Sequence, residues 1–396
     1  MGAALVTSVS QAMHIMARLD DQGMFSDVTW RQESRALVAK VLHGRMAARV
    51  KSHLEACREA GREDRRNGSY TRHVLTALGS LTLEVPRTRT FNPSRLLRAY
   101  ARRAPEIDRM ITAAFVLGLS TRKVGKVLLQ LLGESVSAST VSQVAKQLDT
   151  EVAAFHRRPL NDQYRVLMFD GVVLARKTGA GAIRRPVLVA LGVRSDGRKE
   201  VIDFRQAKGE SQAAWEAFLN DLWTRGLKGE ATRLIVSDGG AGLLAALPLV
   251  YPQVPVQRCW AHKVRNVLDK VRKCDREAVK HDLHRVMHAK GIATARSAAQ
   301  RFAQRWQQPY PKAVACLRGD LDELLVHLEV FAESVWRRAA RTTNAIERCF
   351  LEVRRRTRPM GVMADRTSCE RIVYAVLIGI NQAQGTASPF PLTQNS

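Results

Sequence analysis

Three acidic residues, Asp170, Asp238 and Glu347, stand where a chain of alternating strands and helices would bring their side chains together. Each aspartate follows a short apolar run and precedes a glycine, and the glutamate lies near the start of a helical segment. Carboxylate oxygens are ligands that Mg²⁺ prefers, and two such ions about 3.5–4 Å apart need several of them from the protein. The three residues therefore predict a two-metal site for chemistry on phosphodiesters.

Taken one at a time, these residues have simpler structural explanations. An Asp-Gly pair after a strand is common turn chemistry. A glutamate at the start of a helix is stabilised there by capping or by an i,i+4 ion pair. The metal-site prediction therefore requires the three carboxylates to meet, which depends on the elements that carry them.

The charge of the chain indicates a polyanionic partner. Its 63 Lys and Arg residues outnumber 37 Asp and Glu residues, which gives a formal net charge of +26. Because neutralised phosphates supply most sequence-independent affinity for nucleic acid, we expect DNA or RNA as the partner. The longest purely apolar run, Ile372 to Ile380, falls well short of the roughly 20 residues of a spanning helix, so we expect no membrane partner.

The N-terminus has neither a basic segment nor a long apolar segment of the kind that directs secretion. The six cysteines are scattered along the 396 residues without a Cys-x-x-Cys pair, which is typical of reduced thiols in a cytoplasm. Together with a nucleic-acid partner, these features predict a cytoplasmic, nucleoid-associated location.

Residues 1–104 are expected to form a helical and β-hairpin region that binds DNA. Helical spacing runs through residues 34–66, and alternating runs at 73–78 and 81–85 predict a hairpin. A basic helix beside a basic hairpin favours a DNA-contacting arm, with a plain structural appendage as the alternative. The expected contacts are Arg62, Arg65, Arg66, Arg87 and Arg89.

A helix-turn-helix-like DNA-binding domain is expected over residues 105–155. Hydroxyl residues near Ser120 and Ser137 are good N-caps for two short helices that Gly133 separates. Arg122 and Lys123 are the expected DNA contacts of this domain. Helix pairs broken by glycine also occur in folds that never touch DNA, and the surrounding charge favours the DNA-binding interpretation.

Strand signals begin at Tyr164 and predict an α/β core over residues 160–258. Five runs have strand character: 165–169, 186–193, 199–204, 233–236 and 254–257. The pair Asp196-Gly197 joins the second and third strands as a hairpin. Helices predicted at 211–225 and 241–247 imply parallel crossovers to the fourth and fifth strands.

The pattern beyond the fifth strand is helical. Residues 259–340 are expected to form an all-helical insertion, and residues 341–396 to supply the last helices of the core and a C-terminal tail. The order β-β-β-α-β-α-β followed by helices predicts a ribonuclease H-like catalytic core with an insertion. Fold alone does not give function, so the residues must carry that argument.

This topology is what would assemble the acidic site. Asp170 is expected to end the first strand and Asp238 the fourth, and these two strands lie side by side at the centre of such a sheet. The helix after the insertion has a buried stripe formed by Ile346, Phe350 and Val353. Glu347 falls at the seam of that stripe, from which its side chain can face the sheet.

A set of short motifs extends from about residue 60 to residue 385. Those in the core and the insertion are Gly209-Glu210-Ser211 leading to Trp215, Arg225-Gly226-Leu227, Ser237-Asp238-Gly239, Gln257-Arg258-Cys259-Trp260-Ala261-His262, Arg265-Asn266 and Thr342 to Glu347. Those upstream are Arg66-Asn67-Gly68, Val85-Pro86-Arg87 and Gly118 to Arg122. Together they resemble the Mutator-type DDE transposases of bacterial insertion sequences.

The resemblance implies an enzyme that cleaves and joins DNA. Asp170, Asp238 and Glu347 would be its catalytic and metal-binding residues, with two Mg²⁺ ions, for which Mn²⁺ can substitute, as cofactor. The region before residue 155 would bind the terminal inverted repeats of the element, and strand transfer would then join the element to target DNA. Bringing two DNA ends together makes a homo-oligomer, at least a dimer, the expected assembly.

Two other functions are compatible with parts of this pattern. A ribonuclease H-type nuclease or resolvase would share the three carboxylates and only hydrolyse DNA, although the long insertion and the separate N-terminal region argue against it. A catalytically inert DNA-binding regulator would use the N-terminal regions alone.

Cys259 and His262 open the insertion, and such a pair is similar to one found in the family. Zinc needs about four ligands, and no second tight pair follows, although Cys274 and His281, His284 and His288 lie downstream. We therefore expect a structural motif that sets the helix after the fifth strand, and we do not expect zinc. Trp260 and Trp306 are expected to pack in the interior, with stacking on an unpaired base as the alternative.

Further DNA contacts are expected beside the acidic site. They are Lys263, Arg265, Asn344, Arg348, Arg354, Arg355 and Arg356. A run of charges is by default a solvated face, but the position of this one next to the carboxylates favours contacts to phosphates.

Overall fold

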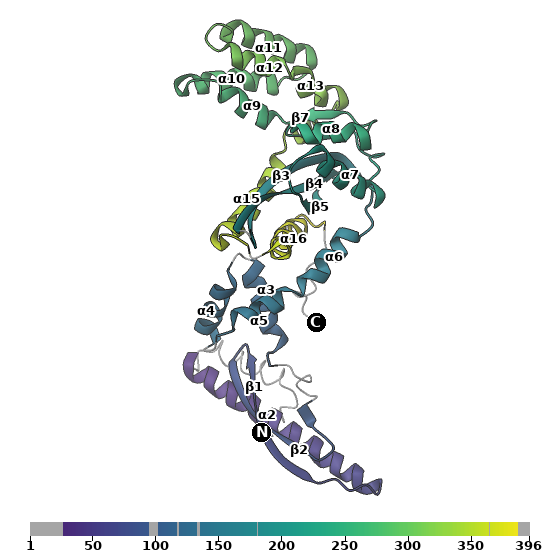
Figure 1. Ribbon diagram of the computed structural model, residues 1–396, viewed down its shortest axis with the longest axis vertical. Helices are drawn as coiled ribbons and strands as arrows, with labels where there is room; N and C mark the ends of the chain where they lie inside the picture. The colour runs from purple at the N-terminus through teal and green to yellow at the C-terminus, as the bar shows by residue number, and fades with distance from the viewer. Residues whose placement is uncertain are drawn as a thin grey trace, which may run out of the picture. The chain divides into compact units, whose positions relative to one another are not determined.

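The computed structural model describes residues 27–94, 102–116, 119–132, 135–179, 181–363 and 365–386 (Figure 1). Contacts divide the chain into two compact units, Met1–Ala145 and Lys146–Ser396. Both units combine helices with strands, so the chain is a mixed α/β protein. No helix of the described residues is long and apolar enough to cross a membrane.

The N-terminal unit begins with helix α2 (Asp27–Glu59), which packs on the antiparallel hairpin of β1 (Arg66–Thr76) and β2 (Gly79–Thr88). The predicted helix extended to residue 66 and was wrong at its end. Gly61 adopts a left-handed φ of 65°, and the Arg62 amide donates to the Cys57 carbonyl, which closes the helix with a Schellman-type turn. The chain thereby becomes free to enter the hairpin at Arg66, seven residues before the predicted start at residue 73.

Three short helices complete this unit: α3 (Pro105–Val116), α4 (Thr121–Leu132) and α5 (Ala138–Ala145). The predicted caps are present, since the Ser120 and Ser137 hydroxyls accept from the amides three residues ahead, at 3.4 Å and 3.1 Å. The core between the helices consists of buried aliphatic residues, among them Ile107, Ile111, Val124, Leu128 and Val141. Gly133, the predicted break, lies outside the described residues.

The second unit begins with α6 (Leu148–Arg157) and contains a five-stranded sheet. The strands are β3 (Tyr164–Thr178), β4 (Gly181–Arg194), β5 (Lys199–Gln206), β6 (Leu234–Ser237) and β7 (Val256–Arg258). Their order across the sheet is β5-β4-β3-β6-β7, antiparallel among the first three and parallel from β3 to β7. The predicted sequence of strands and the pairing of the first with the fourth are confirmed.

Helices α7 (Gln212–Thr224) and α8 (Ala241–Val250) make the two crossovers and pack against each other. The Ser211 hydroxyl accepts from the Ala214 amide and caps α7. Trp215 and Phe218 of α7 and Leu247 of α8 join Phe169 of β3 in one buried cluster, so these helices hold the middle of the sheet from one face.

The first strand is longer than its sequence pattern predicted. Asp170 was expected to end this strand, but β3 continues for eight residues beyond it because β4 pairs with it throughout, with Asp170 opposite Val189. On the other side, pairing with β6 stops at Phe169 opposite Ser237. Asp170 therefore lies inside a strand, directly beyond the end of its parallel neighbour.

Between the sheet and the last helices lies a helical region with its own core. Its helices are α9 (Trp260–Leu268), α10 (Arg276–Met287), α11 (Ile292–Trp306), α12 (Pro311–Arg318), α13 (Leu321–Val330) and α14 (Ser334–Ala340). Trp260 and Trp306 are buried in that core, and their ring nitrogens donate to the Leu324 carbonyl and to Asp282. Packing, and not base stacking, accounts for both tryptophans.

Two helices close the unit: α15 (Asn344–Thr357) and α16 (Arg366–Ala383). The predicted buried stripe of α15 is confirmed by Ile346, Phe350 and Val353, each at most 3% exposed. Helix α16 packs on β5 and α15, and the Asn381 side chain there exchanges two hydrogen bonds with the backbone of Val201.

Candidate functional site

Asp170 is a buried carboxylate with little to neutralise it. The residue is 6% exposed, and its Oδ1 accepts one hydrogen bond, from the Gly171 amide at 2.7 Å. Burial, followed by the nearby charge of Asp238, raises the pKa of Asp170 to about 7, and Glu347 acts in the same direction. The site therefore opposes the ionisation of this carboxyl group.

Asp238 follows directly after β6, beside the point where pairing between β3 and β6 ends. Its Oδ1 accepts from the Gly240 amide at 3.0 Å, and Gly239 between them has a φ of 91°, a conformation that favours glycine. Arg258, whose guanidinium lies beside Gly239, pairs with Asp320 and Glu323. The Asp-Gly pair is thus a turn, as the simple explanation held, and it places the Asp238 carboxylate close enough to Asp170 for its charge to raise the pKa of Asp170.

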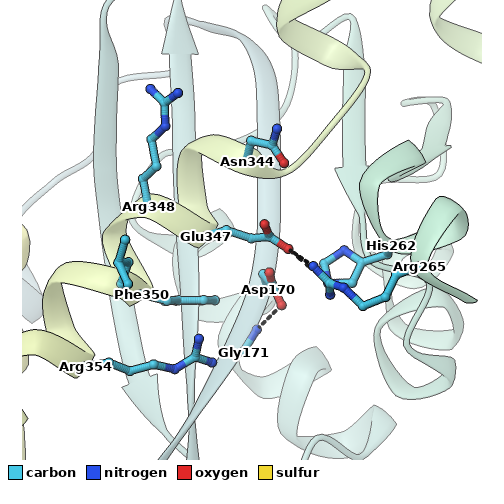
Figure 2. Close-up of a pocket in the computed structure, with 10 residues that line it drawn as sticks. Asp170, Gly171, His262, Arg265, Asn344, Glu347, Arg348, Phe350 and Arg354 are labelled. Carbon is cyan, nitrogen blue, oxygen red and sulfur yellow. Dashed lines mark hydrogen bonds and ion pairs between the residues drawn. The ribbon is translucent and has the colours of Figure 1, made fainter. Parts of the chain in front are cut away.

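Glu347 reaches the same site from the first turn of α15. Its Oε1 lies 3.4 Å from His262 Nε2 and 3.4 Å from Arg265 Nη2, both on α9. Figure 2 shows Glu347 and Asp170 facing each other across one cavity, with the two α9 side chains approaching the glutamate. This cavity has a volume of about 580 Å³ and opens to solvent.

Cys259 fixes the helix that carries His262. The thiol is 1% exposed and accepts from both the amide and the hydroxyl of Thr343, each at 3.2 Å. Thr343 is the residue before α15, so the Cys259 sulfur ties the start of α9 to the start of the helix that holds Glu347. The neighbouring thiol raises the pKa of His262, and Asp170 and Glu347 also favour its protonated form.

A fourth carboxylate, Glu210, was not predicted as part of this site. A methyl group on Gly171 would lie 2.5 Å from Glu210 Oε1, so the glutamate covers the residue next to Asp170. Burial raises the pKa of Glu210, and Asp238 raises it further. No described residue forms an ion pair or a hydrogen bond with this side chain. The available sequence signal was its place in the Gly209-Glu210-Ser211 motif.

The charge balance of these acids fits a divalent cation. Among the described residues, no lysine or arginine forms an ion pair with Asp170, Asp238 or Glu210, and Glu347 meets only one arginine at the outer limit of contact. Their oxygens do not gather within 4.8 Å of one another as a preformed ligand set. Converging carboxylates that outnumber the cations beside them are suited to hard cations such as Mg²⁺, which would draw the oxygens together.

Comparison with known proteins places the chain in a family. The model of the Mutator family of transposases matches residues 7–384. The chain belongs to the Mutator family of transposases. It is 32% identical over 329 residues to the transposase for insertion sequence element IS256 in transposon Tn4001 of Staphylococcus aureus, which covers 82% of this chain and 83% of that protein.

Two further relatives of this Mutator-family chain show the same extent of similarity. It is 30% identical over 321 residues to the transposase for insertion sequence element IS905 of Lactococcus lactis, covering 81% of this chain and 80% of that protein. It is 33% identical over 321 residues to the transposase for insertion sequence element IS406 of Burkholderia multivorans, covering 80% and 81%.

The predicted DNA contacts of this Mutator-family chain divide into three groups in the second unit. Those that line the acidic cavity are Arg265, Asn344, Arg348 and Arg354. Arg355 and Arg356 instead pair with Glu352 on their own helix. Lys263 is 5% exposed and its ammonium contacts Asp320 and the Cys316 carbonyl, so the prediction that it contacts DNA is not supported. Its position on the inner face of α9 explains the difference.

In the N-terminal unit the predicted contacts lie on the surface. All seven are exposed: Arg62, Arg65, Arg66, Arg87, Arg89, Arg122 and Lys123. Four of them meet at the open end of the hairpin, where Arg66 pairs with Thr88 and the Arg89 amide donates to the Arg65 carbonyl. The hairpin therefore gathers cations that are dispersed in the sequence.

Proposed function

We propose that this protein is the DNA transposase of an insertion sequence and that Asp170, Asp238 and Glu347 are its catalytic, metal-binding carboxylates. The observation that carries the proposal is the convergence of these acids from β3, from the end of β6 and from α15, where Asp170 and Asp238 have no lysine or arginine partner among the described residues and Glu347 meets His262 and Arg265. Membership of a transposase family agrees with it. A solvated acidic patch would not raise the pKa of a carboxyl group to about 7, as burial and the charge of Asp238 do at Asp170.

A ribonuclease H-like core is the fold we propose for this site. Support comes from the strand order β5-β4-β3-β6-β7 and from the crossover helices α7 and α8. The helical region from α9 to α14 then interrupts the core between β7 and α15, and this explains the long sequence gap between Asp238 and Glu347.

The three carboxylates, with Glu210 beside them, would hold two Mg²⁺ ions, or Mn²⁺ in their place. When bound, such ions activate the attacking oxygen and stabilise the leaving oxygen of an in-line displacement. Arg265, Arg348 and Arg354 line the same cavity and would hold the phosphates on either side of the scissile bond. His262, held between Cys259 and Glu347, would limit the positions that the glutamate can take.

With these parts the reaction has two stages on DNA. Hydrolysis at the end of the element releases a 3′-hydroxyl group, and that hydroxyl then attacks a phosphodiester of the target strand. The exposed arginines of the hairpin and the helices α3–α5 would bind the terminal inverted repeats. Two ends must be held together for this, so we propose a homo-oligomer of at least two chains that acts on nucleoid DNA.

The decisive experiment compares Asp170→Asn with the wild-type protein on labelled DNA that carries the element's ends. We expect Asp170→Asn to bind this DNA with unchanged affinity and to lose cleavage and joining by at least about a thousandfold, because a metal ligand has been removed. Asp322→Asn is the matched control, since this aspartate is 85% exposed on α13 and lies outside the cavity.

Replacing Mg²⁺ with Ca²⁺ should give bound but uncut DNA with the wild-type protein. Cleavage that survives in Asp170→Asn would remove the proposed active site. Hydrolysis without joining would identify a nuclease, and binding alone in the presence of Mg²⁺ would identify a regulator.

A further inference from the structure

A second group of metal-ligating side chains lies in the N-terminal unit. We infer that His53, Cys57 and Asp64 bind one Zn²⁺ ion. They are the only described His, Cys, Asp or Glu residues whose ligand atoms come together in a group of three or more, all within 4.8 Å of one another. The inference is separate from the absence of zinc expected at Cys259 and His262, and it does not depend on the proposed catalytic function.

The geometry is close to that of a tetrahedral site. His53 and Cys57 are four residues apart on α2, so they project from one face of its last turn. The Cys57 sulfur lies 3.5 Å from His53 Nε2, which in turn lies 2.9 Å from Asp64 Oδ2. Ligands of a tetrahedral zinc ion are separated by about 3.4–3.6 Å, so a shift of the carboxylate by about 1 Å completes the set.

The three side chains are held in place by their surroundings. Cys57 is buried, and the Asp64 side chain is 1% exposed. Phe91 stacks on the His53 ring at 4.5 Å and 16°, which fixes the ring plane. Asp64 Oδ1 accepts from the amides of Arg65 and Arg89 at 2.8 Å and 3.1 Å, so its Oδ2 is directed toward the imidazole. Such outer hydrogen bonds commonly orient the ligands of a metal.

A fourth position is available at Thr90. Its hydroxyl lies 3.3 Å from His53 Nε2 and 2.6 Å from Asp64 Oδ2, so either this oxygen or a water molecule beside it would complete four ligands. Thr88 also donates to Oδ2 and would remain as a second hydrogen bond to the ligating carboxylate.

The alternative is that Asp64 serves only as a hydrogen-bond acceptor for the loop. That role explains the two threonine hydroxyls and the two amides, but it does not require a thiol beside the imidazole nitrogen. A zinc site accounts for all three side chains, because thiolate, imidazole and carboxylate are its usual ligands and a thiolate with a carboxylate balances its double charge. Binding would release the thiol proton of Cys57 to solvent.

The position of the cluster indicates what the ion would do. It joins the end of α2, the loop at Asp64 and, through Thr88 and Thr90, the end of β2. Arg65, Arg66 and Arg89 are exposed around this junction. A bound ion would fix the spacing of these cations, and this consequence for DNA rests on the proposed function.

The test measures zinc in the full-length protein purified without a metal-affinity tag or added metal. We expect about one zinc per chain in the wild type and in Cys274→Ser, which replaces an exposed cysteine, and less than roughly 0.2 in Cys57→Ser and in Asp64→Asn. Cobalt added to wild-type protein from which zinc has been removed should give an absorption band at about 350 nm, with the intensity usual for charge transfer from one thiolate to the metal. Cys57→Ser should abolish this band.

A folding defect is separated from metal loss by melting. Chelation should lower the Tm of the wild type and leave that of Cys57→Ser unchanged. Wild-type protein without zinc and without a cobalt band would overturn the inference, as would full zinc content in Cys57→Ser. Zinc lost in Cys259→Ser but kept in Cys57→Ser would also overturn it by placing the ion at the other pair. None of these measurements uses DNA or Mg²⁺, so they leave the Asp170→Asn test of the proposed function independent.

Discussion

Asp170 and Asp64 are both buried aspartates, but the two units surround them in opposite ways. At Asp170, burial and two other acidic residues raise the pKa to about 7, and one backbone amide is its only donor. At Asp64, burial also raises the pKa, but hydrogen bonds from Thr88, Thr90, His53 and the Arg65 amide outweigh it and hold the pKa well below its usual range. The Asp170 carboxylate therefore lacks an ion-pair partner among the described residues, whereas the Asp64 carboxylate stabilises a loop.

His327, in the helical region, is a buried base whose ionisation is opposed in the same way as that of Asp170. It is 2% exposed, and burial, followed by the charge of Arg341, lowers its pKa to about 4. Its ring meets the Gln257 carbonyl oxygen and no acid. Burial beside like charges therefore suppresses ionisation in both cases, and each of the two residues lines a cavity that is open to solvent.

The comparison is tested most strongly by replacing each aspartate with asparagine in metal-free protein at pH 8. We expect Asp170→Asn to raise the free energy of unfolding of the second unit by on the order of 2–4 kcal/mol, because the variant no longer buries an opposed charge. We expect Asp64→Asn to lower the Tm of the N-terminal unit by several degrees, because an amide group cannot accept all the donors that face Asp64.

Hydrogen exchange resolved along the chain assigns each change to its unit. Added Mg²⁺ should then stabilise the wild type and leave Asp170→Asn unaffected. If both variants were destabilised, Asp170 would have to be a structural residue like Asp64.

A smaller effect is expected from acid at His327. The folded protein holds this ring neutral with a pKa of about 4, and the unfolded value is near 6.5, so its stabilising contribution is present above pH 6.5 and is lost as the pH falls toward 4. The loss is on the order of 3 kcal/mol. His327→Asn, which keeps a polar nitrogen near Gln257, should flatten that part of the stability profile in urea titrations, and an unchanged profile would show that the ring already accommodates the proton.

The smallest effect concerns Glu210. Glu210→Gln should weaken Mn²⁺ binding by about tenfold, roughly 1.4 kcal/mol, because it removes one of the carboxylates that a bound ion would neutralise. Calorimetric titration with Mn²⁺ measures this without turnover. Glu230→Gln is the control, an exposed glutamate on the loop before β6. Equal Mn²⁺ affinities for the two variants would show that Glu210 takes no part in binding the ion.

The order of the strands and the meeting of Asp170 with Asp238 were accessible from sequence because they depend on local patterns. Short apolar runs, Asp-Gly turns and hydroxyl caps predict where elements begin and end. The parallel pairing of β3 with β6 follows from the crossover through α7. The stripe of α15 likewise follows from its 3.6-residue period, which places Glu347 at the seam.

The features of the fold and the site that could not be predicted from the sequence depend on contacts between distant residues. The length of β3 is set by β4 on the other strand of its hairpin, so an apolar run that stops at Phe169 could not show it. Glu210, which lies between β5 and α7, meets Gly171 of β3 only in the assembled sheet domain, and Asp64 meets His53 only after α2 has closed at Gly61. Lys263 was misassigned because its acidic partner, Asp320, lies on the segment before α13.

The contact between Cys259 and Thr343 has a consequence for how the helical region is attached to the sheet. These residues are the first and last points of the helical region, and the Trp260 amide also donates to the Arg341 carbonyl at 3.1 Å. Because the two ends of the region touch, the chain leaves the sheet domain and returns to it at the same place. A change of length within α10–α12, away from this junction and from His262 and Arg265 on α9, would leave the carboxylates on either side of it in place.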